Sequence, residues 1–124
     1  MWIKIVSFLL LTGNIYAHTW HCSNHEVEVA CVDGKCETHS DFTPMDVTFS
    51  DKGSLHVCAY SGCWEGVASV HHYHNYTVVI GKNFISEQAN KKENFFISFD
   101  SEDNISIFKG LGFAMPMMCE QRIR

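Results

Sequence analysis

Basic side chains are scarce in this chain. Its 124 residues include nine Lys and Arg against 14 Asp and Glu, and the formal net charge is −5. No run of basic residues is longer than Lys91-Lys92. Proteins that bind nucleic acid gather Lys and Arg on one face. The scarcity of basic residues therefore argues against nucleic acid as a partner.

The common catalytic motifs are also missing. The chain contains neither the G-x-S-x-G elbow of hydrolases nor the G-x-x-x-x-G-K loop that holds phosphates. His25 and the Glu after it begin a zincin motif, but Val29 stands where the second His belongs. Gly110 and Gly112 begin a dinucleotide fingerprint, but Met115 replaces its third Gly. We therefore expect a protein that is not an enzyme.

Long apolar runs are absent except at the N-terminus. Residues 5–11 are apolar apart from Ser7, Lys4 precedes them, and Ala17 ends a short segment of small and apolar residues. This pattern is typical of a secretory signal peptide over residues 1–17. We expect a mature chain of residues 18–124, periplasmic or secreted, with no membrane span and with no nucleic acid bound. Loss of Lys4 would leave eight basic against 14 acidic residues, a charge of −6.

Six cysteines all lie after the predicted cleavage point. An even number in a short exported chain is typical of disulfides, and we expect three. A zinc site is the alternative, because four residues separate the members of both close pairs and zinc sites allow that spacing. Export favours oxidation, so the disulfide interpretation is preferred. The cysteines are Cys22, Cys31, Cys36, Cys58, Cys63 and Cys119.

The spacing of the cysteines suggests how they pair. Asp33-Gly34 is a strong hairpin signal, and a two-residue loop there places Cys31 opposite Cys36. In a non-hydrogen-bonded antiparallel pair the Cα atoms lie about 4.5 Å apart, which suits a disulfide.

A second hairpin would pair Cys58 with Cys63, although Tyr-Ser is a poor sequence for a tight turn of this kind. Cys22 and Cys119 then remain, and their bond would join the two ends of the domain. The alternative pairs Cys22 with Cys31 or Cys36, and Cys119 with one member of the 58/63 pair.

The rest of the chain alternates between apolar and polar residues in short runs separated by Gly and Asp turns. This pattern predicts seven to eight short strands in a small antiparallel β-barrel or sandwich, an all-β fold stapled by three disulfides. The polar segment 86–92 is expected to be a loop or a single helical turn. The clearest strand signals lie at residues 26–29, 46–49, 55–57, 76–80, 95–99 and 105–108.

Aromatic residues supply the predicted core and candidate contacts. We expect Trp64, Phe95, Phe99 and Phe113 to fill the core, since large aromatics bury much apolar area. Neighbours such as Phe95 and Phe96 should point to opposite faces of their strand. The aromatic residues that we expect to contribute to a binding surface are Tyr60, Trp64 and Tyr73.

The eight histidines provide a second candidate site. On a regular strand, His72 and His74 share one face, and imidazole binds copper and zinc. Cleavage after Ala17 would make His18 the first residue, with an amine and a ring that could chelate copper together. In this one residue the chain resembles exported copper carriers and copper oxygenases that begin with His. The alternative is that these histidines are simply solvated strand residues.

One loop invites comparison with a known family. Small periplasmic lysozyme inhibitors are disulfide-bearing β-barrels that present a Ser-Gly-x-x-Tyr loop to the enzyme. Here Ser61-Gly62 is followed by Glu65 where that Tyr would stand, and Trp64 comes one place early. The chain is therefore similar to those inhibitors in architecture but departs from their motif.

These observations favour an exported binding protein without enzymatic activity, whose partner is another protein, as for an inhibitor or an immunity factor. The alternative is a copper- or zinc-binding protein of the periplasm that uses His18, His72 and His74. A small secreted hydrolase is the third hypothesis.

Overall fold

The computed structural model describes residues 18–86 and 91–122. Every regular element in these residues is a β-strand, which confirms the predicted all-β class. The strands are β1 (Thr19–Ser23), β2 (Glu28–Val32), β3 (Lys35–His39), β4 (Asp46–Ser50), β5 (Ser54–Ala59), β6 (Gly62–Val67), β7 (Ser69–Tyr73), β8 (Tyr76–Ile85), β9 (Lys92–Asp100), β10 (Ile105–Gly110) and β11 (Phe113–Arg122).

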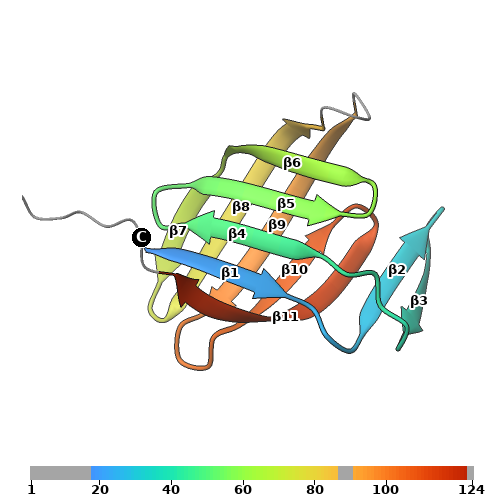
Figure 1. The fold of residues 1–124 in the computed structure, drawn as a ribbon, viewed down its shortest axis with the longest axis horizontal. Helices are drawn as coiled ribbons and strands as arrows, with labels where there is room; N and C mark the ends of the chain where they lie inside the picture. Colours follow the sequence, from blue (N-terminus) through green and yellow to red (C-terminus); the bar gives the residue numbers. More distant parts are fainter. Residues whose placement is uncertain (1–17, 87–90, 123–124) are drawn as a thin grey trace, which may run out of the picture.

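The strands form one antiparallel sheet that curls into a nearly closed barrel (Figure 1). Its order is β6-β5-β4-β1-β11-β10-β9-β8-β7. Strand β1 pairs with β4 on one side and with β11 on the other, so it joins the two ends of the chain. Strands β2 and β3 form a hairpin that leaves this path and pairs with the sheet only through β11. We call this hairpin, residues 28–39, the arm.

The barrel closes where β6 lies next to β8. A β-bulge between Gly81 and Phe84 bends β8, and Phe84 turns into the interior, where it is buried. Two glycines leave room for this ring. A Cβ atom on Gly66 would lie 3.0 Å from the Phe84 ring, and one on Gly81 would lie 3.2 Å from it. These glycines let the sheet close around Phe84.

The core lies inside the barrel and is aromatic. Phe95, Phe99 and Trp64 are buried, as predicted, while Phe113 is half-buried and packs against the core from one end. Phe95 points inward and Phe96 outward, as strand alternation requires. Several of the rings pack edge-on: those of Trp64 and Phe95 have centroids 5.9 Å apart at an interplanar angle of 65°.

The structure forms the three predicted disulfides, and the arm bears out the first. Cys31 and Cys36 face each other one pair from the turn, with Cα atoms 4.1 Å apart. Asp33 and Gly34 both have positive φ, 51° and 78°. A type I′ turn requires this at both central positions, and Asp-Gly is a preferred sequence for it.

Cys58 and Cys63 form the second disulfide, across the β5–β6 hairpin. The loop residues Tyr60 and Ser61 both keep negative φ, and Gly62 after them takes φ 136°. A residue with a Cβ atom would rarely adopt that angle. Gly62 therefore allows a tight hairpin although Tyr-Ser is a poor turn sequence.

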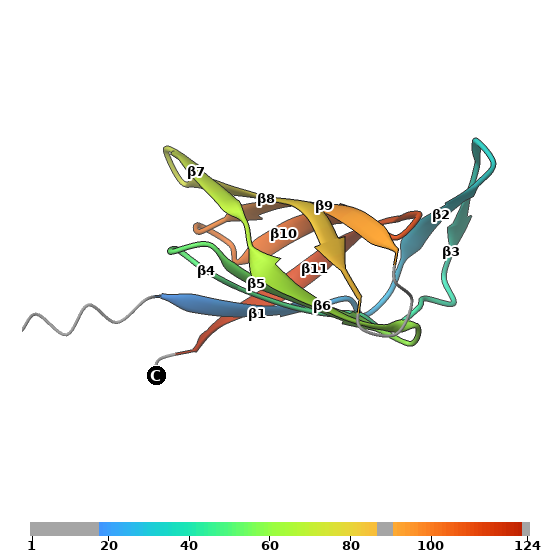
Figure 2. The same ribbon diagram turned by 90° about the horizontal axis from the view of Figure 1, so that it is seen from above.

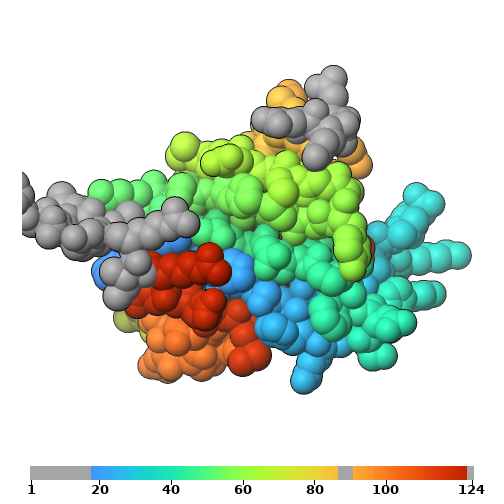
Figure 3. Space-filling view, viewed as in Figure 1, coloured from blue at the N-terminus to red at the C-terminus, as the bar shows by residue number. Residues whose placement is uncertain are grey.

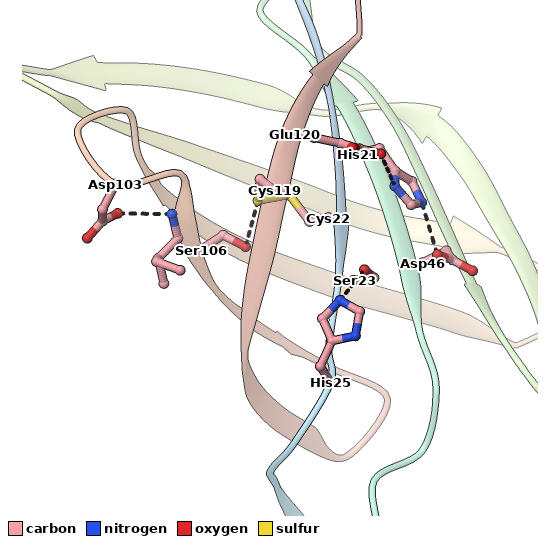
Figure 4. The surroundings of a disulfide bond; sticks show 10 residues. His21, Cys22, Ser23, His25, Asp46, Asp103, Ser106, Cys119 and Glu120 are labelled. Carbon is pink, nitrogen blue, oxygen red and sulfur yellow. Dashed lines mark hydrogen bonds and ion pairs between the residues drawn. A yellow bond between two sulfur atoms is a disulfide. The ribbon is translucent and has the colours of Figure 1, made fainter.

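The third disulfide, Cys22–Cys119, crosses the ladder between β1 and β11 (Figure 4). The two cysteines form the fourth of the five paired positions, and Cys22 is fully buried. Beside it on the outer face, one His21 ring nitrogen lies 2.9 Å from Asp46 and the other 3.8 Å from Glu120. The bond therefore lies between a polar outer surface and the core.

The described residues form eleven strands, more than the seven to eight predicted. Strand β11 gave a weak signal because Pro116 lies within it, and proline cannot donate to a sheet ladder. Residues 115–117 pair with β10 alone, between the segments of β11 that pair with β2 and with β1. On the side of β11 away from β10, no strand pairs with Pro116, so the absence of an N–H there costs little free energy. Of the predicted loop 86–92, residues 87–90 lie outside the described residues and Lys92 begins β9.

None of the described residues belongs to a helix that could cross a bilayer. Three disulfides in so small a domain are typical of extracellular and periplasmic proteins, where the environment is oxidising.

The two kinds of disulfide should differ in their effect on stability. Cys22→Ser/Cys119→Ser should lower the free energy of unfolding more than Cys31→Ser/Cys36→Ser, because 97 positions separate the first pair and five separate the second. Loop entropy gives about 4 to 5 kcal/mol for the long closure and about 2 kcal/mol for the short one. Chemical denaturation of both variants measures this. Equal losses would contradict a loop-entropy origin.

Candidate functional site

One end of the barrel carries a groove of about 600 Å³. A second hollow of about 500 Å³ continues it along the outside of β9 and β10. We call the first hollow the end groove. It lies between the β5–β6 turn, the β10–β11 turn and the arm (Figure 2). The residues that line both hollows are Cys31, Glu93, Leu111, Gly112 and Phe113.

The β10–β11 turn forms the contact between the groove and the arm. Leu111 and Gly112 both have positive φ, 59° and 83°, as in a type I′ turn. The Cys31 backbone N–H donates to the Gly112 carbonyl at 2.7 Å. A Cβ atom on Gly112 would lie 3.1 Å from the Cys31 carbonyl oxygen, so the absence of a side chain allows this approach.

A buried asparagine fixes the base of the arm. Asn24, which is buried, donates from Nδ2 to the Thr43 carbonyl at 2.8 Å and accepts at Oδ1 from the Met45 N–H at 2.9 Å. One amide thus satisfies two backbone groups of the segment that follows the arm. Buried backbone groups need such partners.

A buried carboxylate holds the same segment from the other side. Glu28, at the start of the arm, accepts from the Thr43 N–H at 2.9 Å and from the Thr43 hydroxyl at 3.4 Å. His39, the cross-strand partner of Glu28, lies 3.7 Å from this carboxylate. The first residue of the arm is therefore hydrogen-bonded to the segment that leads into β4.

Two exposed apolar side chains lie on the hairpins that border the groove. Tyr60, in the β5–β6 turn, is 82% exposed and lines the end groove. Val32, beside the arm turn, is 71% exposed. Figure 3 shows the notch between the tip of the β5–β6 hairpin and the cyan arm. Each hairpin is closed by a disulfide one pair from its end.

The groove also carries polar groups. Lys91 and Glu93 form an ion pair of 3.4 Å along its lining, with Lys91 exposed and Glu93 largely covered. Thr43 and Ser61 contribute hydroxyl groups to the same lining. The groove therefore offers an apolar surface with charged and hydrogen-bonding groups at its edges, a mixture found in recognition sites.

Of the three predicted binding aromatics, Tyr60 and Trp64 both line the end groove. Trp64 is only 3% exposed, so the expectation of a surface contact fails for most of this side chain. It faces inward on β6 opposite Val57, because alternation places it in the core. Its indole N–H is buried and has no hydrogen-bond partner.

Tyr73, the third predicted aromatic, is 70% exposed but lies at the β7–β8 turn. Figures 1 and 2 both place this turn at the opposite end of the barrel from the β5–β6 turn. The structure therefore separates Tyr73 from Tyr60, and the two cannot contact one small surface on a partner.

The three histidines predicted as metal ligands are not brought together. His18 begins the described chain, and its Nδ1 accepts from the Gln121 amide at 2.6 Å. His72 Nδ1 lies 3.1 Å from the Thr77 hydroxyl at the far end of the barrel. His74 follows the end of β7 in a turn with φ 55°, so strand alternation no longer aligns it with His72. In this structure the three histidines therefore do not form one metal site.

Among the described residues, a different group has three potential ligand atoms within 4.8 Å of one another: His56, Cys58 and Cys63. Sequence reasoning missed His56. The available signal was its position two residues before Cys58 on a predicted strand, which puts both side chains on one face.

Comparisons of the chain with protein-family models, with curated proteins and with solved structures found no match.

The clamp at the base of the arm can be tested with a matched pair of asparagines. Asn24 and Asn94 each accept from a backbone N–H at 2.9 Å, but the first bond is buried and the second is exposed. Asn24→Ala should lower the free energy of unfolding by about 2 to 3 kcal/mol, because it leaves buried backbone groups unpaired. Asn94→Ala should cost less than about 1 kcal/mol, since water replaces the amide. Similar losses in urea denaturation would show that the clamp contributes little.

Proposed function

We propose that this chain is an exported protein without enzymatic activity that binds another protein at the end groove, as an inhibitor or an immunity factor does. The observation that carries the proposal is the pair of disulfide-closed hairpins that border the groove, each with an exposed apolar side chain near its tip. Large exposed apolar side chains beside a concave surface are typical of contact residues.

Preorganisation supports this proposal. The free energy lost when loops and side chains become ordered on binding reduces affinity. Here the disulfides restrict both hairpins before a partner arrives, and the Asn24 and Glu28 clamp restricts the arm. Tyr60 has only two rotatable side-chain bonds, so it adds contact area at a small entropic cost.

Charge suggests the chemistry of the partner. Without residues 1–17 the chain carries eight basic and 14 acidic residues. On the arm, beside the groove, two acidic side chains, Asp33 and Glu37, are exposed, and Lys35 is the basic side chain exposed with them. A partner with a positively charged face would be attracted and oriented by this field, and added salt would slow its association.

The proposal can be tested with substitutions at the two ends of the barrel. Immobilised chain 18–124 is exposed to the other exported proteins of the same organism, and the captured partner is titrated against purified variants. Tyr60→Ala and Val32→Ser should each weaken binding about tenfold or more, because each removes an exposed apolar contact. Tyr73→Ala is the matched control, since a tyrosine that is also largely exposed is lost from the far end.

Retained affinity in Tyr73→Ala, with losses in the other two variants, is the expected pattern. Equal affinity of the partner for the unsubstituted chain and for all three variants would refute the end groove as the binding site. A loss of affinity confined to Tyr73→Ala would place the site at the β7–β8 turn instead.

A further inference from the structure

Three potential metal ligands meet on the outer face of the β5–β6 hairpin. The ring nitrogens of His56 lie 3.5 Å and 3.8 Å from the Cys58 sulfur. Cys63 faces Cys58 across the hairpin, and one ligand atom from each of the three residues lies within 4.8 Å of the other two. Strand alternation places His56 and Cys58 on the same face, because Val57 between them is buried in the core.

We infer that reduction of the Cys58–Cys63 disulfide converts this hairpin into a binding site for one Zn²⁺ or Cu⁺ ion, with His56 as the third ligand. A disulfide is a poor metal ligand, whereas thiolates and imidazole together are the donors that these two ions prefer. The oxidised hairpin is then a staple, and the reduced hairpin is a metal site.

The reductant is a dithiol. Its two sulfurs are oxidised to a disulfide while the bond between Cys58 and Cys63 breaks, and its two protons and two electrons yield two cysteine thiols. A divalent or monovalent ion then replaces the two thiol protons, which pass to solvent. The imidazole of His56 supplies one ring nitrogen as the third ligand. Three protein ligands leave a further position for water or for a donor from another molecule.

The hairpin keeps its ligands facing one another after the disulfide opens. Strands β5 and β6 pair over six positions, and the Cα atoms of the two cysteines are 4.2 Å apart. On the inner face, Val57 and Trp64 hold the two strands in the core. The bond closes a loop of only a few residues, so its loss frees little chain entropy. Cys63 is exposed, so a small dithiol can reach it.

The arm provides an internal control. Its cysteines have the same spacing and nearly the same Cα separation, 4.1 Å, but among the described residues no histidine or carboxylate completes a group of three there. Reduction of the arm therefore yields two thiols without a third ligand. Comparison of the two hairpins therefore distinguishes a three-ligand metal site from the weaker binding that any pair of thiols gives.

The test uses the chain with residues 18–124, reduced by a dithiol reagent and freed of reagent under anaerobic conditions. Thiol alkylation and mass spectrometry identify which disulfides have opened, and circular dichroism confirms that the β-structure is retained. Zinc affinity is then measured by competition with a chelator. Cys31→Ser/Cys36→Ser, which keeps the proposed site, should bind one Zn²⁺ per chain when it is reduced and none at the same concentrations when it is oxidised.

Two variants then test the ligands. His56→Ala in that background should weaken zinc binding at least about tenfold. The converse variant, Cys58→Ser/Cys63→Ser, keeps the arm cysteines and should bind at least about tenfold more weakly than its counterpart. Co²⁺ gives an independent readout, since thiolate ligation produces a charge-transfer band that should require a higher Co²⁺ concentration in the converse variant than in its counterpart.

Equal affinities in the two double-serine variants, or an unchanged affinity in His56→Ala, would overturn the inference. So would a Cys58–Cys63 bond that dithiols cannot open while the chain remains folded.

Discussion

The pairing of β1 with both β4 and β11 is the constraint on which the rest of the structure depends. Apart from the short pairing of β2 with β11, the other strand pairings are between strands that are close in sequence, whereas β1 joins the first described residues to the last. The Cys22–Cys119 disulfide lies within the β1–β11 ladder and cross-links this long-range pairing covalently. Closing so long a loop costs chain entropy, so a cross-link there stabilises the fold more than a cross-link across a short loop.

With the barrel closed in this way, its two ends differ. One end carries two short hairpins, each closed by a disulfide, and between them the type I′ turn at Leu111 and Gly112 supports the arm. Asn24 and Glu28 hold the strand connection beneath. Among the described residues, both hairpins at this end are cross-linked by disulfides, which restricts their motion before any partner binds. The proposed function depends on that rigidity.

Local features were readable from the sequence, and most long-range ones were not; the Cys22–Cys119 bond followed only by elimination, once the two hairpin disulfides had been assigned. Asp33-Gly34 between two cysteines predicted both a turn and a disulfide because the information lies within six residues. The sequence did not indicate strand β11, because Pro116 lies within it. The sheet accommodates this proline because neither β1 nor β2 pairs with β11 at that position. The end groove was unpredictable because its lining comes from distant segments. The direction of His74 depends on where β7 ends, and the sequence alone left that point undefined.

Hydrogen exchange measured by mass spectrometry, on the chain alone and in complex with its captured protein partner, tests the central claim most directly. If the end groove is the binding site, amides of residues 30–33, 59–62 and 111–113 should exchange more slowly in the complex. Amides of residues 72–76 at the opposite end should be unchanged. Protection confined to residues 72–76, with none around the groove, would contradict the account.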